Sequence, residues 1–554
     1  MTLSFEPAAH LAKQMLQERV VSRIWERDIS VWHAEHDSDA ARSISTRLGW
    51  LDVGKTMPPH LERVARLGTD AREEAIEAVY LLGMGGSSLC AEVLRSVQGV
   101  AEGSPDLHVL DTTDERTLTS AAARMVPERT WILVASKSGS TVEVASMERY
   151  FWSRMTAALG NKASRQFIAV TDPDTALQKL AATKGYRKTF INPPDIGGRF
   201  SALSLFGLVP TALLGASARD VLSAGSVMAE GCRQENHANA GLELGAFLGA
   251  ATLAGRDKLT VVLPPSLSVL GLWIEQLIAE STGKHGKGAL PVVDEPLGRP
   301  DEYGQDRAFV AITTDRDAPD KEKLAALEAA NHPVLRLTTR MDGLGAELFR
   351  WEFATAVAGA ALGINPFDEP NVSEAKEKTK ALLSAYGKDH RLPETEPLAQ
   401  EGDIAVHTRA FAGATPPDVI RAALDEVKPG DYVAFLAYLP ADGSVERAVA
   451  EARLAIRSRT RAATTFGVGP RYLHSTGQYH KGGPNTALAF VITADDETQT
   501  EIPDSGYSFS VLKRAQALGD FQTLEAHGRR VVRIHLEGAD PAGSLERLFA
   551  EALK

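Results

Sequence analysis

The sequence predicts an α/β protein built on doubly wound parallel sheets. Apolar runs such as residues 131–135 (Trp-Ile-Leu-Val-Ala) are short, continuous and bounded by turn residues, as in strands buried on both faces. Helical stretches lie between most of these runs, which favours parallel strands joined by crossover helices. Two of the runs lead through small polar residues into a helix, at the sheet edge where ligands bind in such folds.

The predicted strands form three groups along the chain, because 554 residues are too many for one hydrophobic core. We expect strands at residues 79–82, 107–110, 131–135, 167–171 and 189–191, then at 259–263, 308–312 and 334–337, and finally at 432–438, 464–468, 488–493 and 530–536. The expected domains are an N-terminal helical segment (1–74), a first sheet domain (75–215), the first part of a second (216–370), a polar helical insertion (371–427) and a C-terminal α/β block that completes the functional site (428–554).

Composition excludes several classes of protein. The formal charge of −12 argues against general nucleic-acid binding, which requires basic surface. The two cysteines, Cys90 and Cys232, lack metal-ligand spacing, and the N-terminus lacks a signal-peptide pattern, so we expect a cytoplasmic protein. No apolar run reaches membrane-spanning length. His474 and His480 have no third ligand at a suitable spacing, so we expect no metal site.

Residues 136–143 (Ser-Lys-Ser-Gly-Ser-Thr-Val-Glu) are the strongest candidate for a binding site. They lie between a predicted strand and a predicted helix, whose N-terminus presents unpaired N–H groups and a partial positive charge. The hydroxyls of this loop donate further hydrogen bonds, and Lys137 adds a cation. An ordinary capped turn is the alternative, but Lys137 and the following helix favour an anion site.

A glycine turn follows the first predicted strand at residues 83–88 (Gly-Met-Gly-Gly-Ser-Ser). The glycines allow a ligand to approach the backbone, and Ser87 lies at the start of the next helix. A dinucleotide fold begins with a similar turn, and an acidic residue follows at Asp111. However, the third glycine of that fingerprint is missing.

Three charged residues stand out further along the chain. Arg199 follows two glycines and precedes an apolar helix, which suggests a guanidinium at a buried edge; an arginine that faces solvent or a neighbouring carboxylate is the alternative. Glu280 lies near the C-terminus of an apolar helix, where the helix dipole disfavours its charged form, as suits a proton-transfer base. Lys513 lies on a predicted helix and is equally explained as a surface lysine.

Together these motifs resemble the glucose-6-phosphate isomerases of the sugar-isomerase (SIS) family, and most of all the isomerase half of bifunctional transaldolase/glucose-6-phosphate isomerase proteins. The motifs that carry the resemblance occur in family order at residues 83–87, 136–141, 197–201 and 280–284, within a similar stretch of 75–540. The sequence departs from the family where His480-Lys481-Gly482 replaces His-Gln-Gly, and the C-terminal lysine is displaced. Nothing in the chain resembles the transaldolase barrel.

The resemblance implies two SIS-type subdomains with helical additions and an aldose–ketose isomerase that needs neither metal nor nicotinamide. It places the substrate phosphate on Ser136, Ser138, Thr141 and the adjoining helix. The implied roles are ring opening by His480, oriented by Glu143, and by Lys513, proton transfer by Glu280, and stabilisation of a cis-enediolate by Arg199. The implied substrate-binding residues are Gly86, Ser87, Ser136, Lys137, Ser138 and Thr141.

The resemblance also implies a homodimer, in which the neighbouring subunit contributes the histidine. Three alternatives stay open at this point. A non-catalytic phosphosugar regulator would share the fold, and an isomerase for a related sugar such as mannose 6-phosphate would share the site. A dehydrogenase would show nicotinamide binding.

Overall fold

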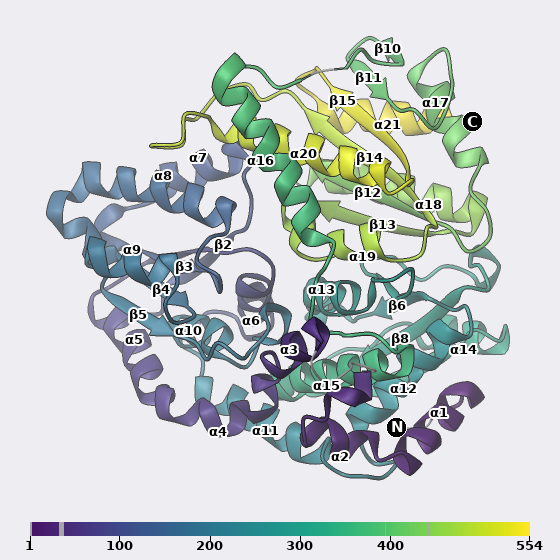
Figure 1. The fold of residues 1–554 in the computed structure, drawn as a ribbon, viewed down its shortest axis with the longest axis horizontal. Coiled ribbons are helices and arrows are strands. Elements are labelled where there is room, and N and C mark those ends of the chain that lie inside the picture. The colour runs from purple at the N-terminus through teal and green to yellow at the C-terminus, as the bar shows by residue number, and fades with distance from the viewer. Residues whose placement is uncertain (1–2, 33–37, 394, 441–442) are drawn as a thin grey trace.

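Three sheets organise the chain, each with helices on its faces (Figure 1). The structure is a computed structural model, and it describes residues 3–32, 38–393, 395–440 and 443–554. In Figure 1 the first sheet, in blue, lies on the left, and the third sheet, in green and yellow, lies at the upper right. The second sheet, in teal, lies below the third. The predicted α/β class is confirmed.

The first sheet is fully parallel, with the strand order β2-β1-β3-β4-β5. Its strands are β1 (Ala78–Leu82), β2 (Asp106–Leu110), β3 (Thr130–Ala135), β4 (Phe167–Thr171) and β5 (Lys188–Ile191). Alternate side chains of β1 enter two separate hydrophobic clusters, with Val79 and Leu81 on one face and Tyr80 and Leu82 on the other. Helices therefore cover both faces, as doubly wound topology requires.

The second sheet is also parallel, with the order β7-β6-β8-β9. Its strands are β6 (Lys258–Val262), β7 (Leu290–Val292), β8 (Arg307–Thr313) and β9 (Val334–Thr338). Strand β7 was not predicted, because it is only three residues long and contains Pro291. One cluster joins this sheet to the first, since Val310 and Ile312 share it with Val79.

The third sheet has the order β10-β11-β15-β14-β12-β13. Its strands are β10 (Ala399–Glu401), β11 (Ile404–His407), β12 (Tyr432–Tyr438), β13 (Ala463–Val468), β14 (Ala487–Ala494) and β15 (Arg530–Leu536). Strands β12 to β15 are parallel, whereas β11 pairs antiparallel with β15 and β10 with β11. The unpredicted β10 and β11 lie within residues 371–427, so part of that polar segment joins the last sheet. The domain boundaries themselves stay a prediction.

Helices pack between the sheets, and α1 to α5 form the N-terminal segment. The α-helices are α1 (Glu6–Gln17), α2 (Val20–Trp25), α3 (Asp39–Ser45), α4 (Val53–Thr56), α5 (Leu61–Glu73), α6 (Leu89–Gln98), α7 (Glu115–Arg124), α8 (Val142–Leu159), α9 (Ala176–Lys184), α10 (Leu205–Leu213), α11 (Ala218–Gly231), α12 (Ala240–Leu253), α13 (Leu270–Thr282), α14 (Lys321–Ala329), α15 (Leu344–Leu362), α16 (Val372–Asp389), α17 (Pro416–Asp425), α18 (Ser444–Thr460), α19 (Gly477–Gly482), α20 (Phe509–Ala526) and α21 (Pro541–Ala552). Helix α15 is buried along most of its length and packs against α11, α12 and α13. Three tryptophans anchor the N-terminal segment to the core: Trp32 and Trp50 are buried, and Trp25 stacks on Phe349 and Phe353.

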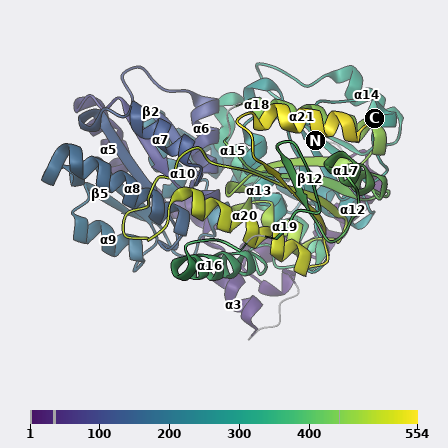
Figure 2. The ribbon, with the colours of Figure 1, turned by 90° about the horizontal axis from the view of Figure 1, so that it is seen from above.

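Two helices connect the third sheet with the first. Helices α16 and α20 pack side by side, as both views indicate (Figures 1 and 2). Helix α16 faces α8, the helix that follows the carboxyl end of β3. The carboxyl ends of the first sheet's strands therefore lie beneath a helix supplied from the second half of the chain.

Within the described ranges, no helix is long and apolar enough to cross a membrane. The same residues contain no group of three or more histidine, cysteine or acidic side chains that could hold a metal ion. Cys90 and Cys232 are buried free thiols.

Packing of α15 against α11 gives a test of the fold. A Cβ at Gly345 would lie 1.9 Å from the backbone oxygen of Val221, so Gly345→Ala must push the two helices apart. We expect a loss of about 1–3 kcal/mol, seen as a lower midpoint of thermal unfolding. Gly231→Ala is the matched control, because a Cβ there meets nothing within 4 Å and alanine favours a helix. Equal midpoints for the two variants would contradict this packing.

Candidate active site

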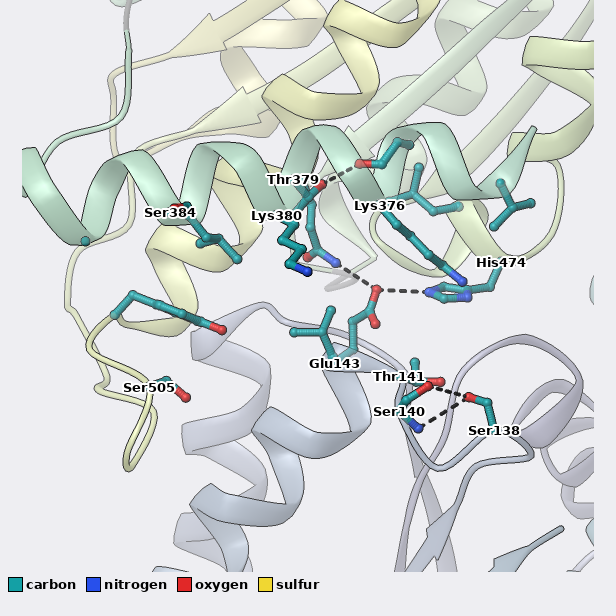
Figure 3. Close-up of a pocket in the computed structure, with 18 of the residues that line it drawn as sticks. Ser138, Ser140, Thr141, Glu143, Lys376, Thr379, Lys380, Ser384, His474 and Ser505 are labelled. Carbon is teal, nitrogen blue, oxygen red and sulfur yellow. Dashed lines mark hydrogen bonds and ion pairs between the residues drawn. The ribbon is translucent and has the colours of Figure 1, made fainter. Parts of the chain in front are cut away.

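The loop after β3 forms one wall of a cavity of about 710 Å³. Ser138, Ser140 and Thr141 line it at the N-terminus of α8, and α16 forms the opposite wall (Figure 3). No side chain caps the first turn of α8, so its N–H groups are left for an anion. Gly139 has a φ of 66°, which a side chain would strain. These features support the predicted anion site.

Two other residues of the predicted loop do not line the cavity. The Lys137 ammonium forms an ion pair with Asp172 and donates a hydrogen bond to the oxygen of Pro194 at 3.0 Å. Ser136 is buried, and its hydroxyl lies 3.3 Å from Thr141 Oγ1 and accepts a hydrogen bond from Gly139 N at 3.1 Å. Both residues therefore shape the loop rather than face the cavity.

The glycine turn lies beneath the site instead of lining the cavity. Gly85 has a φ of 55°, and a Cβ there would lie 2.8 Å from the oxygen of His474. A Cβ at Gly86 would lie 2.0 Å from the oxygen of Gly198. Ser87 is buried next to them. The turn thus permits the loop that carries Arg199 and the segment that carries His474 to approach closely.

Glu143 is buried at the start of α8 and pairs with His474. Its Oε1 lies 2.9 Å from Nε2 of His474 and accepts a hydrogen bond from Gln516 Nε2 at 2.7 Å (Figure 3). Burial raises the pKa of Glu143, but His474, with a smaller contribution from Lys376, outweighs burial and holds the pKa below its usual value. Glu143 is therefore a carboxylate that orients an imidazole.

The predicted contact of Glu143 with His480 is wrong. His480 lies on α19, is 2% exposed, and has Nδ1 2.8 Å from the hydroxyl of Tyr432. Burial and the neighbouring Lys481 and Arg529 lower the pKa of His480 to about 3, so the imidazole is neutral. A side chain so enclosed does not reach Glu143 of its own chain.

Lys513 is also held outside the cavity. Its ammonium is buried and pairs with Asp114 Oδ2 at 2.8 Å and Asp496 Oδ1 at 2.5 Å. The lysine that faces Glu143 and His474 is Lys376, on α16 (Figure 3). Among the described residues, Lys376 has no ion-pair partner. Lys376 lies in the predicted polar helical insertion (371–427) and was not predicted as a site residue, because mixed charges at helical spacing do not indicate which groups they face.

Arg199 is buried in a socket that three segments build. Its Nε donates to Ser281 Oγ at 2.7 Å, and its Nη2 donates to the oxygens of Pro366 at 2.7 Å and Asp368 at 2.8 Å. The remaining nitrogen, Nη1, lies 3.0 Å from Glu369 Oε2 and 3.7 Å from Glu280 Oε1. Arg199 is thus fixed in position and directed at two carboxylates.

Glu280 lies on the last turn of α13 and is buried next to Arg199. Gln276, one turn earlier, donates to Glu280 Oε2 at 3.1 Å and to the oxygen of His474 at 2.8 Å, which joins this pair to the cavity wall. Burial raises the pKa of Glu280; Glu369 adds to the rise, whereas Arg199 and His474 oppose it. The net pKa stays above the usual value, which suits a group that accepts and returns a proton near neutral pH.

One family model matches part of the chain. Residues 53–296 match the family model of phosphoglucose isomerase.

Similar full-length relatives include two bacterial glucose-6-phosphate isomerases. The protein from Rubrobacter xylanophilus is 29% identical over 59% of this chain and 87% of its own length. The protein from Carboxydothermus hydrogenoformans is 28% identical over 68% of this chain and 95% of its own length.

Solved structures support the fold. A hypothetical protein from Thermus thermophilus superposes with a TM-score of 0.59 at 22% identity, over 69% of this chain and 98% of its own. A glucose-6-phosphate isomerase from Chlamydia trachomatis gives a TM-score of 0.54 at 18% identity, over 69% of this chain and 86% of its own.

The buried His480 gives a pH test of the site's framework. In the unfolded chain a histidine has a pKa near 6.5, against about 3 in the folded protein, so the unfolded state binds more protons between these values. The stability contributed by neutral His480 is complete above about pH 6.5 and is lost as the pH falls towards 3.

We therefore expect His480→Gln, which does not titrate, to lose less stability than the wild type between pH 7.5 and pH 5. The measurement is the thermal unfolding midpoint at each pH. Parallel losses in the two proteins would show that His480 is protonated in the fold.

Proposed function

We propose that this chain interconverts glucose 6-phosphate and fructose 6-phosphate by proton transfer through a cis-enediolate. The observation that carries the proposal is the buried pair of Glu280 and Arg199, 3.7 Å apart, which Gln276 links to His474 in the wall of a cavity that ends in an uncapped helix N-terminus. The match of residues 53–296 to phosphoglucose isomerase supports the same reaction.

The phosphate binds at the N-terminus of α8 in this proposal. The hydroxyls of Ser138, Ser140 and Thr141 and the free N–H groups of the first turn provide hydrogen bonds and a partial positive charge. Lys137 acts through the backbone of the loop, because its ammonium is taken by Asp172. This binding holds the sugar ring towards His474.

Ring opening falls to His474 and Lys376 rather than to His480 and Lys513. Glu143 accepts a hydrogen bond from Nε2 of His474, which leaves Nδ1 of the ring to exchange a proton with a sugar oxygen. Lys376 lies across the cavity and supplies a cation beside the same oxygen atoms. These assignments follow from which side chains reach the cavity.

Isomerisation falls to Glu280 and Arg199. Glu280 removes the C2 proton of the open-chain aldose, the electron pair of the broken C–H bond forms the C1–C2 double bond, and the carbonyl electron pair moves to the C1 oxygen to give the enediolate. The hydroxyl proton on the C2 oxygen then passes to the C1 oxygen, and Glu280 returns its proton to C1. Arg199 is fixed by Ser281 and two backbone oxygens, so it stabilises the developing negative charge without reorganising. No step requires a cofactor.

All these residues belong to one chain. His474 comes from the segment after β13 and reaches Glu143 of the same chain, which supports a histidine contributed within the chain rather than by a partner subunit. Dimerisation stays a prediction, but the proposed chemistry does not depend on it.

The role of Glu280 is tested by Glu280→Gln. We expect the variant to lose both isomerisation, in an assay coupled to glucose 6-phosphate formation, and exchange of the C2 proton with deuterated water. Binding of a non-isomerisable hexitol 6-phosphate should persist. Glu275→Gln is the control, because Glu275 is a buried carboxylate on the same helix outside the Arg199 pair. Exchange that continues in Glu280→Gln would remove Glu280 from this role.

Mixing two inactive variants, Glu280→Gln and His474→Ala, tests whether His474 acts in the site of its own chain or in that of a partner subunit. If His474 serves Glu280 of its own chain, every site in a mixed assembly has a defect, and refolding the two together restores nothing. Chains with different tags would report subunit exchange. Recovery towards a quarter of wild-type activity, the limit for random dimers that share sites, would show that His474 crosses to a partner.

A further inference from the structure

Glu369 is a charged residue of the site that the proposed mechanism leaves without a role. It lies in the loop between α15 and α16, and its Oε2 is 3.0 Å from Arg199 Nη1, the nitrogen that also faces Glu280. Two carboxylates from different segments therefore share one side of one guanidinium. The other nitrogens of Arg199 are already bonded to Ser281 and to backbone oxygens.

The charges around this cluster hold Glu369 ionised. The groups that face it are Arg199, Arg47 (Nη1 4.0 Å from Glu369 Oε1) and Lys284, which itself pairs with Asp368 at 2.7 Å. Burial raises the pKa of Glu369, but these cations bring the net pKa below its usual value. Glu369 is thus an anion at neutral pH.

Glu280 experiences the opposite balance. The groups that face it are Arg199, Glu369, His474 and Gln276. Burial raises its pKa, and the repulsion from ionised Glu369 raises it further, against the attraction of Arg199. Two carboxyl groups whose environments drive their pKa values apart are the usual arrangement of an acid–base site. Here Glu369, which stays ionised, offsets the positive charge of Arg199 next to Glu280, which titrates.

We propose that Glu369 is a positioning residue for the isomerisation: it anchors Arg199 and offsets part of its charge, so that Glu280 remains basic enough to take the C2 proton. This inference rests on the proposed function. Without Glu369, Arg199 would act on Glu280 alone, and Glu280 would become a weaker base.

The test uses Glu369→Gln, which removes the charge and keeps an oxygen to accept the hydrogen bond from Arg199. We expect the acid limb of kcat/KM for fructose 6-phosphate to move to lower pH, with a lower plateau. Glu369→Asp should keep the limb near its wild-type position. Glu374→Gln is the control, because Glu374 pairs with His527 and Asn371 outside this cluster. An acid limb that stays in place in Glu369→Gln would overturn the proposal, whatever the loss of activity.

A second measurement needs no turnover. The carboxyl band of Glu280 in infrared difference spectra is assigned by its loss in Glu280→Gln and is then titrated in each variant. The pH at the midpoint of this titration should be lower in Glu369→Gln than in the wild type and should be unchanged in Glu374→Gln. An unchanged midpoint would overturn the role of Glu369. A wild type that titrates as expected but does not isomerise the sugar phosphates would overturn only the proposed function.

Discussion

The carboxylate of Glu143 joins parts of the chain that are more than three hundred residues apart. One of its oxygens is hydrogen-bonded to Nε2 of His474 and to Nε2 of Gln516, which are 331 and 373 residues away in the sequence. A buried carboxylate is costly unless it is paired, so these contacts stabilise it and at the same time fix the third sheet's segments above the first sheet. These three residues line the cavity, so the contact joins segments from both halves of the chain at one wall.

Close backbone approach makes the second half of the site possible. A Cβ at Gly86 would meet the oxygen of Gly198, and a Cβ at Gly85 would meet the backbone of His474. The turn after β1 thus supports both the arginine loop and the histidine segment without contributing a functional side chain. Arg199 donates hydrogen bonds to the loop that precedes α16. That loop therefore connects the charged cluster of Arg199, Glu280 and Glu369 to α16, which forms one wall of the cavity.

The sequence predicted which segments form strands and helices better than it predicted which segments lie side by side. Apolar runs marked the strands of the first sheet and the parallel strands of the third, because buried parallel strands are nearly all apolar. The three-residue strand β7 and the antiparallel pair β10 and β11 carry no such run. Glu280 and Arg199 were found because their local sequence was unusual for stability alone. In the structure, Nη1 of Arg199 lies 3.7 Å from Oε1 of Glu280, and their roles stay a prediction.

The choice between His474 and His480 could not be made from the sequence. Both lie in one glycine-rich segment, and only the packing of α19 against Tyr432 shows that His480 is enclosed. Lys376 and Glu369 were missed for a related reason. Their sequence surroundings resemble a solvated helix and an ordinary loop, and their significance comes from the groups they face.

The path of the chain from β13 to His474 has a consequence for how the protein responds to dilution. A site that two subunits share is lost when they dissociate, so its activity falls once the protein concentration drops below the dissociation constant. Here the histidine and its carboxylate are joined by covalent chain, and their effective concentration is set by folding alone. In the proposed mechanism, specific activity is therefore constant over any range of enzyme concentration in which the chain stays folded.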